Sequence, residues 1–156
     1  MAAFTVSEVC SATKGVASKL LDVNFKRVCT DTRAVQLGDL FIPLVGENFD
    51  GHDFIAQAVK NGAAGIISSR EDLIVPSHVA VVLVPDTLIA LQDLARFHRN
   101  RFSIPIVAIT GSNGKTTTKD MAAAVLGSRL KVLKTQANYN NEIGLPLTLL
   151  EMTEEH

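Results

Sequence analysis

The stretch IVAITGSNGKTTTKD, residues 106–120, decides the fold that this chain is expected to adopt. An almost wholly apolar run leads into a short segment that contains Gly111 and Gly114, and a helix-forming run begins near Lys115. A phosphate-binding loop needs this order, because small residues let backbone N–H groups point inward and the positive end of a helix lies directly behind them. The stretch therefore predicts a strand, a phosphate loop and a helix.

Two residues of this loop have side chains suited to nucleotide chemistry. Lys115 can place a point charge on the β- and γ-phosphates, and the hydroxyl of Thr116 can bind Mg²⁺. The strict pattern GxxxxGK[ST] is not met, since Ile109 stands where its first glycine belongs. A chance glycine-rich turn is the alternative, but the flanking strand and helix favour phosphate binding. The predicted ATP-binding residues are Gly111, Ser112, Asn113, Gly114, Lys115, Thr116 and Thr117, with Lys115 as the catalytic residue and Thr116 as the metal ligand.

The rest of the chain reads as alternating short strands and helices. Buried parallel strands are expected at 63–69 and 79–84, and the apolar run at 39–46 is broken by Pro43, which indicates a strand end or an edge. Around the phosphate loop, strands at 103–110 and 130–135 should form a βαβ unit with a right-handed crossover. Helices are expected at 4–14 (capped by Thr5 or Ser7), 53–62, 86–100 and 115–128.

Composition excludes several classes of protein. Of the 156 residues, 47% are hydrophobic and 20% are charged, which is typical of a globular protein, and the net charge of -1 gives no basic field for nucleic acid or an anionic membrane. The N-terminus does not have the pattern of a secretion signal, and no apolar run reaches the ~18 residues of a membrane span. Cys10 and Cys29 lack metal or redox spacing, so we expect reduced thiols in a cytosolic protein. The basic cluster of Arg96, His98, Arg99 and Arg101 is interpreted as a solvated helix end.

Three segments resemble one enzyme family. The short loop T-G-S-N-G-K-T, residues 110–116, resembles that of the ATP-dependent Mur ligases and of folylpolyglutamate synthetases. The segment LKVLKTQANYNNEIGLPLTLL, residues 130–150, is similar to the one that follows the ATP loop in the Mur ligases that add D-alanyl-D-alanine, although Ala137 stands where glycine is usual. Residues 30–63 are similar to the uridine-nucleotide-binding domain of these enzymes, with its T-D-T-R turn, G-D-L-F and D-G-H-D-F.

This resemblance implies a fold and a domain order. It implies an α/β protein in which residues 1–84 form a small domain that binds the UDP-linked substrate and residues 85–104 form a connecting helix. Residues 105–156 would be the beginning of a P-loop α/β domain of the ATPase type, truncated at His156. Because the rest of the active site would follow His156, the chain alone is expected not to catalyse ligation.

The resemblance also implies an activity. It is that of an ATP-dependent amide-bond ligase of peptidoglycan precursor synthesis, a monomer in the bacterial cytoplasm with ATP and Mg²⁺ as cofactors and no nucleic-acid or membrane partner. The enzyme would join D-Ala-D-Ala to UDP-N-acetylmuramoyl-tripeptide through an acyl phosphate. The alternatives are another member of the superfamily with a different acceptor, and a nucleotide-binding module without catalysis.

The candidate substrate residues each have a simpler structural interpretation. In the turn at Thr30, Asp31, Thr32 and Arg33, the guanidinium could hold a pyrophosphate and the threonine hydroxyls could bind phosphate or ribose; the alternative is an internal Asp31–Arg33 pair. Asn48 and the segment F-D-G-H-D-F at 49–54 could line the same site, with Asp50, Gly51 and His52 as its candidate residues. The alternative is a helix-entry loop capped by Asp50 or Asp53, with His52 on its surface.

A second set of candidates follows the phosphate loop. Asn138, Asn140 and Asn141 could face the substrate or could hold backbone turns, because asparagine tolerates left-handed geometry. Lys119 and Lys134 are interpreted as surface charges, and Glu142 as a solvated carboxylate.

Overall fold

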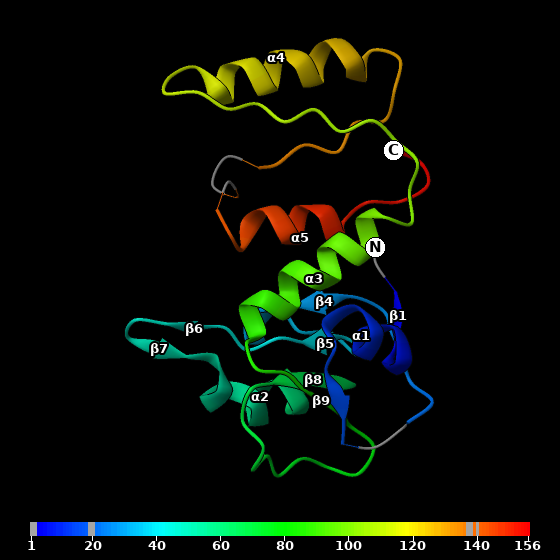
Figure 1. Cartoon of the computed structure of the whole chain (residues 1–156), viewed down its shortest axis with the longest axis vertical. Coiled ribbons are helices and arrows are strands. Elements are labelled where there is room, and N and C mark those ends of the chain that lie inside the picture. The colour runs from blue at the N-terminus through cyan, green and yellow to red at the C-terminus, as the bar shows by residue number, and fades with distance from the viewer. Residues whose placement is uncertain (1–2, 19–20, 137–138, 140) are drawn as a thin grey trace.

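The computed structural model describes residues 3–18, 21–136, 139 and 141–156. A five-stranded sheet forms the centre of its larger part, with the strand order β2-β9-β8-β5-β4 (Figure 1). Neighbouring strands run parallel from β4 to β9, and only β2 pairs in an antiparallel manner, at one edge. The strands are β2 (Val16–Ala17), β4 (Val28–Cys29), β5 (Leu40–Phe41), β8 (Gly65–Ser68) and β9 (Ala80–Leu83).

The predicted parallel strands are confirmed in type and position. β8 and β9 pair over four residues, from Gly65 opposite Ala80 to Ser68 opposite Leu83. The apolar run at 39–46 gives β5, which lies inside the sheet, and Pro43 follows its end. A hairpin comes next, in which β6 (Val45–Gly46) pairs with β7 (Phe49–Asp50). A strand end is therefore the correct reading of Pro43, and an edge position is not.

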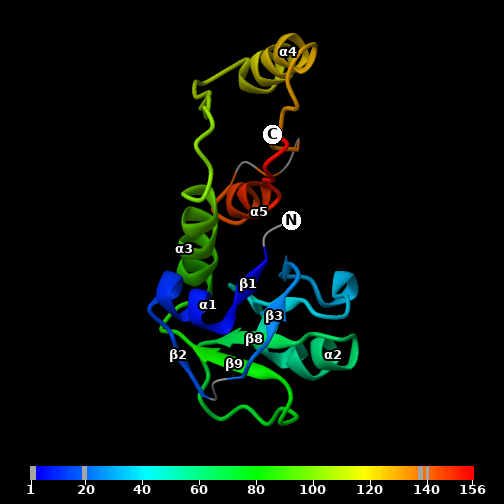
Figure 2. The same ribbon diagram turned by 90° about the vertical axis from the view of Figure 1, so that its right-hand side faces the viewer.

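Helices cover both faces of the sheet (Figure 2). One face packs against α1 (Val6–Thr13) and α3 (Thr87–Arg99), and the other packs against α2 (Ile55–Lys60). Because successive strand residues point to opposite faces, Leu40 joins the core under α1 and α3 while Phe41 joins the core under α2. In the same way, Ile67 of β8 joins the core under α1 and α3, and Ile66 joins the core under α2. A continuous apolar strand therefore contributes side chains to two cores.

The first helix confirms the predicted cap. Thr5 accepts a hydrogen bond from the backbone N–H of Glu8 at 3.1 Å, and the Glu8 carboxylate accepts one from the backbone N–H of Thr5 at 2.8 Å. The two bonds satisfy donors that a helix start leaves free, and they fix the turn between α1 and β1 (Phe4–Thr5). β1 pairs with β3 (Asn24–Phe25) in a separate two-stranded ladder.

The basic end of α3 differs from the prediction of a solvated face. His98 is buried, and the Arg101 guanidinium lies 4.8 Å from the ring centroids of both Phe4 and Phe97. Arg101 also pairs with Glu8 at 2.8 Å. Sequence periodicity identified the helix, but only the fold brings the N-terminal strand over its last turn. The prediction was therefore wrong for His98, whereas Arg101 is exposed as predicted and also contacts the N-terminal segment.

The predicted βαβ unit around the phosphate loop is absent from the described residues. The helix is present as α4 (Lys115–Gly127), yet neither 103–110 nor 130–135 forms a strand. A strand needs a ladder partner, and these two segments do not pair with each other or with the sheet. Ile106 and Val107 are consequently half or more exposed, as are Met121 and Val125 of α4.

The last helix, α5 (Gly144–Leu150), packs against the part of the molecule that contains the sheet. It contacts α3, and Leu150 belongs to the core under α1 and α3. The Gln92 amide donates to the carbonyl oxygen of Glu142 at 3.3 Å. In both views α4 stands apart at the far end of the molecule, with α5 between it and the sheet (Figures 1 and 2).

Candidate functional site

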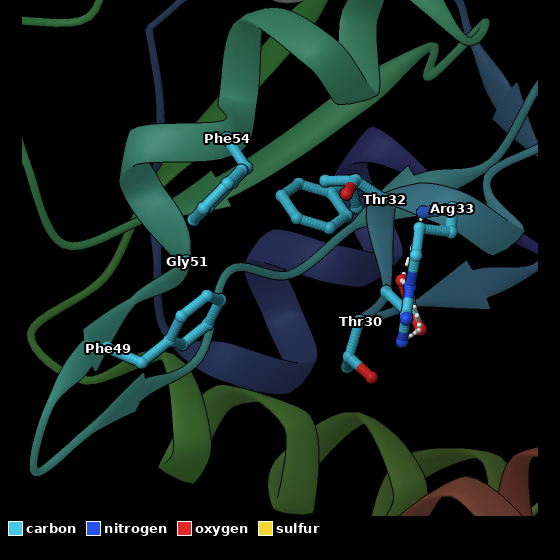
Figure 3. Close-up of a pocket in the computed structure, with 8 residues that line it drawn as sticks. Thr30, Thr32, Arg33, Phe49, Gly51 and Phe54 are labelled. Atoms are coloured by element: carbon cyan, nitrogen blue, oxygen red, sulfur yellow. Dashed lines mark hydrogen bonds and ion pairs between the residues drawn. The ribbon is translucent and has the colours of Figure 1, made fainter.

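A hollow of about 420 Å³ opens at the carboxyl end of the parallel strands. One side of it comes from the loop after β4, and the other from the hairpin and 3₁₀ turn after β5, with Phe41 of β5 also in the lining (Figure 3). Ligands of parallel α/β sheets bind at this edge, because the loops that follow the strands converge there. The lining residues are Thr30, Asp31, Thr32, Arg33, Phe41, Phe49, Gly51 and Phe54.

The first wall contains all four residues of the predicted T-D-T-R turn. Asp31 accepts a hydrogen bond from the backbone N–H of Arg33 at 2.9 Å and caps a short 3₁₀ helix, Thr32–Ala34. Its carboxylate also binds Nε of Arg33 at 3.0 Å and Nη2 at 2.7 Å. The hydrogen bonds from Arg33 hold the pKa of Asp31 below its usual range. The internal pair considered from sequence is thus present.

The pair does not bury the guanidinium. The Arg33 side chain remains 88% exposed at the rim of the hollow. Within the described part of the chain its Nη1 makes no hydrogen bond, so a donor edge faces solvent. Asp31 orients the planar group, and an oriented guanidinium matches the oxygens of a phosphate. The two interpretations offered from sequence are therefore compatible.

Residues outside the motif hold this first wall in place. The buried carboxylate of Asp39 accepts a hydrogen bond from Nη2 of Arg27 at 2.6 Å. The same Nη2 donates a hydrogen bond to the carbonyl oxygen of Ala34, also at 2.6 Å. From the other side, the Asn61 amide donates to the carbonyl oxygen of Thr32 at 2.8 Å. Arg27 and Asn61 were missed by sequence reasoning, although the aspartate of G-D-L-F pointed to a buried charge that needs a partner.

The second wall presents two aromatic rings. Phe49 and Phe54 stack with their centroids 5.3 Å apart and their planes 19° apart, and they remain 57% and 43% exposed. Figure 3 shows them on one side of the hollow, with Thr30, Thr32 and Arg33 on the other. Sequence analysis assigned the segment F-D-G-H-D-F to the site but singled out only Asp50, Gly51 and His52 within it, although the two phenylalanines were a signal for a planar apolar surface.

The other predicted residues of this segment lie behind or beside the wall. Asn48 is exposed in the turn of the hairpin and does not line the hollow. Gly51 does line it, and its backbone N–H donates to Leu44 at 2.8 Å. Asp50 caps the 3₁₀ turn Gly51–Phe54 that leads into α2, rather than α2 itself.

His52 is not a surface loop residue, so that alternative was wrong. Its side chain is buried, with Nδ1 2.6 Å from Oδ1 of Asp50. Nε2 accepts the backbone N–H of Ser69 at 3.2 Å, which places the ring proton on Nδ1. Both ring nitrogens are used inside the protein, so His52 supports the wall and does not reach the hollow.

The phosphate loop has the predicted turn geometry. Gly111 and Gly114 have φ of 150° and 77°, in the region that glycine adopts freely, and Gly114 is the N-cap of α4. The ammonium of Lys115 folds back to the carbonyl oxygens of Gly111 and Ser112. The loop is exposed, and the helix N-terminus behind it is the arrangement that suits phosphate oxygens.

The Asn-rich segment is only partly described. Asn138 and Asn140 lie outside the described residues. The side-chain oxygen of Asn141 accepts the backbone N–H groups of Gly144 at 2.8 Å and Ile143 at 3.3 Å, so it supports the start of α5. For Asn141 the structure therefore favours the turn-holding interpretation.

The two lysines of this region, Lys119 and Lys134, both have polar partners. Lys119 donates to the carbonyl oxygen of Thr135 at 2.7 Å and is largely covered, so it is more than a surface charge. Lys134 pairs with Asp120 at 2.9 Å in an exposed position.

The described ranges contain no cluster of three or more histidine, cysteine, aspartate or glutamate residues that could hold a metal ion. Cys10 and Cys29 are free thiols, and burial raises the pKa of Cys29. No described helix combines the length and apolar character that a membrane crossing requires.

Comparison with known proteins finds two matches to models of one enzyme family in this chain. Residues 24–99 match the Mur ligase family catalytic domain, and residues 109–156 match the Mur ligase middle domain. The first match contains the hollow, and the second contains the phosphate loop. This chain belongs to the Mur ligase family.

Within the family, two similar curated proteins are ligases of one specificity. The UDP-N-acetylmuramoyl-tripeptide–D-alanyl-D-alanine ligase of Synechocystis is 52% identical over 86% of this chain, and that of Bacillus subtilis is 52% identical over 81%. The chain spans 30% of the length of the first relative and 28% of the second.

Solved structures agree with this comparison. A crystal structure of MurF from Acinetobacter baumannii matches all of the chain at 36% identity with a TM-score of 0.92, and the chain covers 34% of it. The MurF ligase of Thermotoga maritima in complex with ADP matches 80% of the chain at 40% identity with a TM-score of 0.72, and 28% of that structure is covered.

Proposed function

We propose that this chain supplies the uridine-nucleotide site and the ATP phosphate loop of a ligase that adds D-alanyl-D-alanine to UDP-N-acetylmuramoyl-tripeptide. Residues 1–84 would bind the UDP-linked substrate, 85–104 would connect, and 105–156 would begin the ATP-binding domain. The observation that carries the proposal is the hollow, where the exposed Arg33 guanidinium faces two exposed aromatic rings. The similarity to D-alanyl-D-alanine ligases supports the choice of substrate.

The two walls of the hollow suit the two ends of a uridine diphosphate. Arg33 and the hydroxyls of Thr30 and Thr32 provide donors for phosphate and ribose oxygens. The stacked faces of Phe49 and Phe54 provide an apolar surface for a planar base. Asp31 keeps the guanidinium oriented before the ligand arrives, which lowers the entropy lost on binding.

The phosphate loop suits the other substrate. Its glycines allow backbone N–H groups to face phosphate oxygens, and the first turn of α4 adds the positive end of a helix. Lys115 would leave the Gly111 and Ser112 carbonyl oxygens and bind the β- and γ-phosphates. Binding ATP therefore requires one side-chain movement in a loop that already has its backbone turn.

Mg²⁺ would neutralise charge on the β- and γ-phosphates. Thr116 offers one hydroxyl oxygen at the start of α4, and Mg²⁺ at nucleotide sites takes few protein ligands and keeps waters and phosphate oxygens. The residues present fit such an ion, because a dedicated carboxylate cage is not needed.

The reaction proposed for the whole enzyme has two steps. The substrate carboxylate attacks the γ-phosphorus of ATP, which forms an acyl phosphate and releases ADP. The amine of D-Ala-D-Ala then attacks the acyl carbon, loses a proton, and releases phosphate to leave an amide. This chain would contribute orientation of the UDP-linked substrate through Arg33 and charge neutralisation at the phosphates through Lys115.

A calorimetric titration of UDP-N-acetylmuramoyl-tripeptide into the purified chain tests the proposal. UMP and ATP with Mg²⁺ serve as comparison ligands. We expect the UDP-linked peptide to bind, Arg33→Met to weaken that binding, and ATP to bind independently of Arg33. Absence of binding by a demonstrably folded chain would contradict the substrate site, and binding of ATP alone would restrict the function to the loop.

A further inference from the structure

The aromatic wall of the hollow lies outside the main sheet. Phe49 belongs to the two-stranded hairpin, and Phe54 ends the 3₁₀ turn that follows it. The backbone hydrogen bond from Gly51 to Leu44 attaches the segment between them. The relative position of the two rings therefore depends on side chains behind the wall.

One carboxylate organises the rear of the wall. Oδ1 of Asp50 accepts the backbone N–H of His52 at 2.9 Å and the Nδ1–H of its ring at 2.6 Å. Oδ2 of Asp50 accepts a hydrogen bond from Nη2 of Arg70 at 2.5 Å. Hydrogen bonds from His52 and Arg70 overcome the effect of burial and lower the pKa of Asp50 to about 2, so the carboxylate is ionised at neutral pH.

The Arg70 guanidinium reaches a second carboxylate. Its Nη1 donates to Oδ1 of Asp53 at 3.0 Å. Asp50 is the residue directly after Phe49, and Asp53 is the residue directly before Phe54. One guanidinium thus bridges the chain neighbours of both stacked phenylalanines, at the two ends of the 3₁₀ turn.

Arg70 is itself attached to the central sheet. Ser68, the last residue of β8, is fully buried, and its hydroxyl donates to the carbonyl oxygen of Arg70 at 2.9 Å while it accepts the Arg70 backbone N–H at 2.9 Å. The adjacent Ser69 donates its backbone N–H to His52. The loop after β8 therefore forms a fixed support from which Arg70 extends to the wall.

We propose that Arg70 is a positioning residue of the substrate hollow, which sets the spacing of the Phe49 and Phe54 rings by holding Asp50 and Asp53 together. Arg70 does not line the hollow, and it acts on the ligand only through the wall. The consequence for affinity rests on the proposed uridine-nucleotide site, whereas the effect on ring geometry does not.

Arg70→Met tests the proposal, because it keeps the aliphatic length and removes both charged hydrogen bonds. Arg70→Lys is the conservative variant, since one ammonium can bind either carboxylate but cannot form the planar fork to both. Arg96→Met is the matched control, because it removes another arginine–aspartate pair, with Asp93 on α3, that does not line the hollow.

Two readouts separate positioning from stability. Inter-ring nuclear Overhauser effects between Phe49 and Phe54 report the wall directly, and calorimetry with UDP-N-acetylmuramoyl-tripeptide reports its consequence. For Arg70→Met we expect the inter-ring effects to weaken and the affinity to fall about tenfold, by analogy with the loss that follows removal of a partner that orients a metal-binding residue. Arg70→Lys should be intermediate, and Arg96→Met should match the unsubstituted chain in both readouts.

The outcomes distinguish this inference from the proposed function. Unchanged inter-ring effects in Arg70→Met would overturn the positioning role, whatever the affinity. Equal changes in Arg96→Met would also overturn it, because they would show a general loss of stability. If the unsubstituted chain binds no UDP-linked peptide, the proposed function fails, and the ring geometry still decides the role of Arg70.

Discussion

The Nε2 atom of His98 lies 3.0 Å from the carbonyl oxygen of Met152, and the two residues join the end of α3 to the segment after α5. His98 is buried between the rings of Phe4 and Phe102, with centroids at 5.9 and 5.0 Å. Its Nδ1 has no hydrogen-bond partner among the described residues. A protonated ring would place an unpaired N–H in this apolar contact, so burial, with Arg101 nearby, lowers the pKa of His98.

The attachment of α5 should therefore depend on pH. Because the folded pKa of His98 lies below that of the unfolded chain, the unfolded chain binds more protons between the two values, and stability falls as the pH drops below about 6.5. Urea unfolding at pH 7.5 and 5.5 measures the difference. His98→Gln, which can still donate to Met152, should reduce it, whereas His78→Gln at an exposed position should not. Equal pH dependence in all three chains would contradict this.

Arg33→Met should weaken nucleotide binding without affecting the fold. The side chain is 88% exposed and its only ion pair in the described chain is with Asp31, two residues away. Exposed pairs of this kind contribute little to stability, so the thermal midpoint should stay unchanged. Calorimetry should show the loss of affinity for UDP-N-acetylmuramoyl-tripeptide. A lowered thermal midpoint with unchanged affinity would assign Arg33 to the turn alone.

Lys115→Met should abolish most of the ATP affinity and leave α4 intact. Among the described residues the ammonium donates hydrogen bonds to backbone oxygens of its own loop, and it is the charge expected to meet the β- and γ-phosphates. In a titration with a fluorescent ATP analogue, we expect the dissociation constant to rise at least about tenfold. This rise corresponds to a loss of ~1.4 kcal/mol in binding free energy. Lys131→Met, which removes an exposed pair with Glu155, is the control. Equal affinities of the two variants would exclude a phosphate contact by Lys115.

Gly51→Ala should destabilise the wall of the hollow. An added Cβ would lie 2.8 Å from both the backbone nitrogen and the backbone oxygen of Leu44, so the backbone must shift. Overpacking of this kind costs about 1–3 kcal/mol in the free energy of unfolding, which urea denaturation measures. Gly46→Ala, in the hairpin that precedes Gly51, places the added Cβ 3.9 Å from its nearest atom and should change the stability much less. If both substitutions lowered the free energy of unfolding by a similar amount, the loss would come from the backbone preference of alanine and not from the contact with Leu44.

Local sequence patterns predicted those parts of the fold that depend on neighbouring residues. The capped first helix, the two buried parallel strands and the glycine turn before α4 each follow from residues a few positions apart. The strands expected at 103–110 and 130–135 failed, because a strand is defined by a partner that local sequence does not provide.

The candidate site shows the same division. The T-D-T-R turn was identified from its residue types, and its internal ion pair follows from their spacing. Arg27, Asn61 and Arg70 were missed, because each supports the hollow from a different loop or helix, and nothing in their local sequence indicates which backbone they will meet.

By itself, then, the sequence determined the first four helices, the two buried parallel strands and the phosphate turn, since these depend on backbone preference and on side-chain chemistry over a few positions. Only the tertiary structure decided that Phe49 and Phe54 face Arg33 across one hollow, and that His98 is buried rather than solvated. These outcomes depend on contacts between distant segments, and such contacts form only when the sheet and its helices bury their apolar faces together.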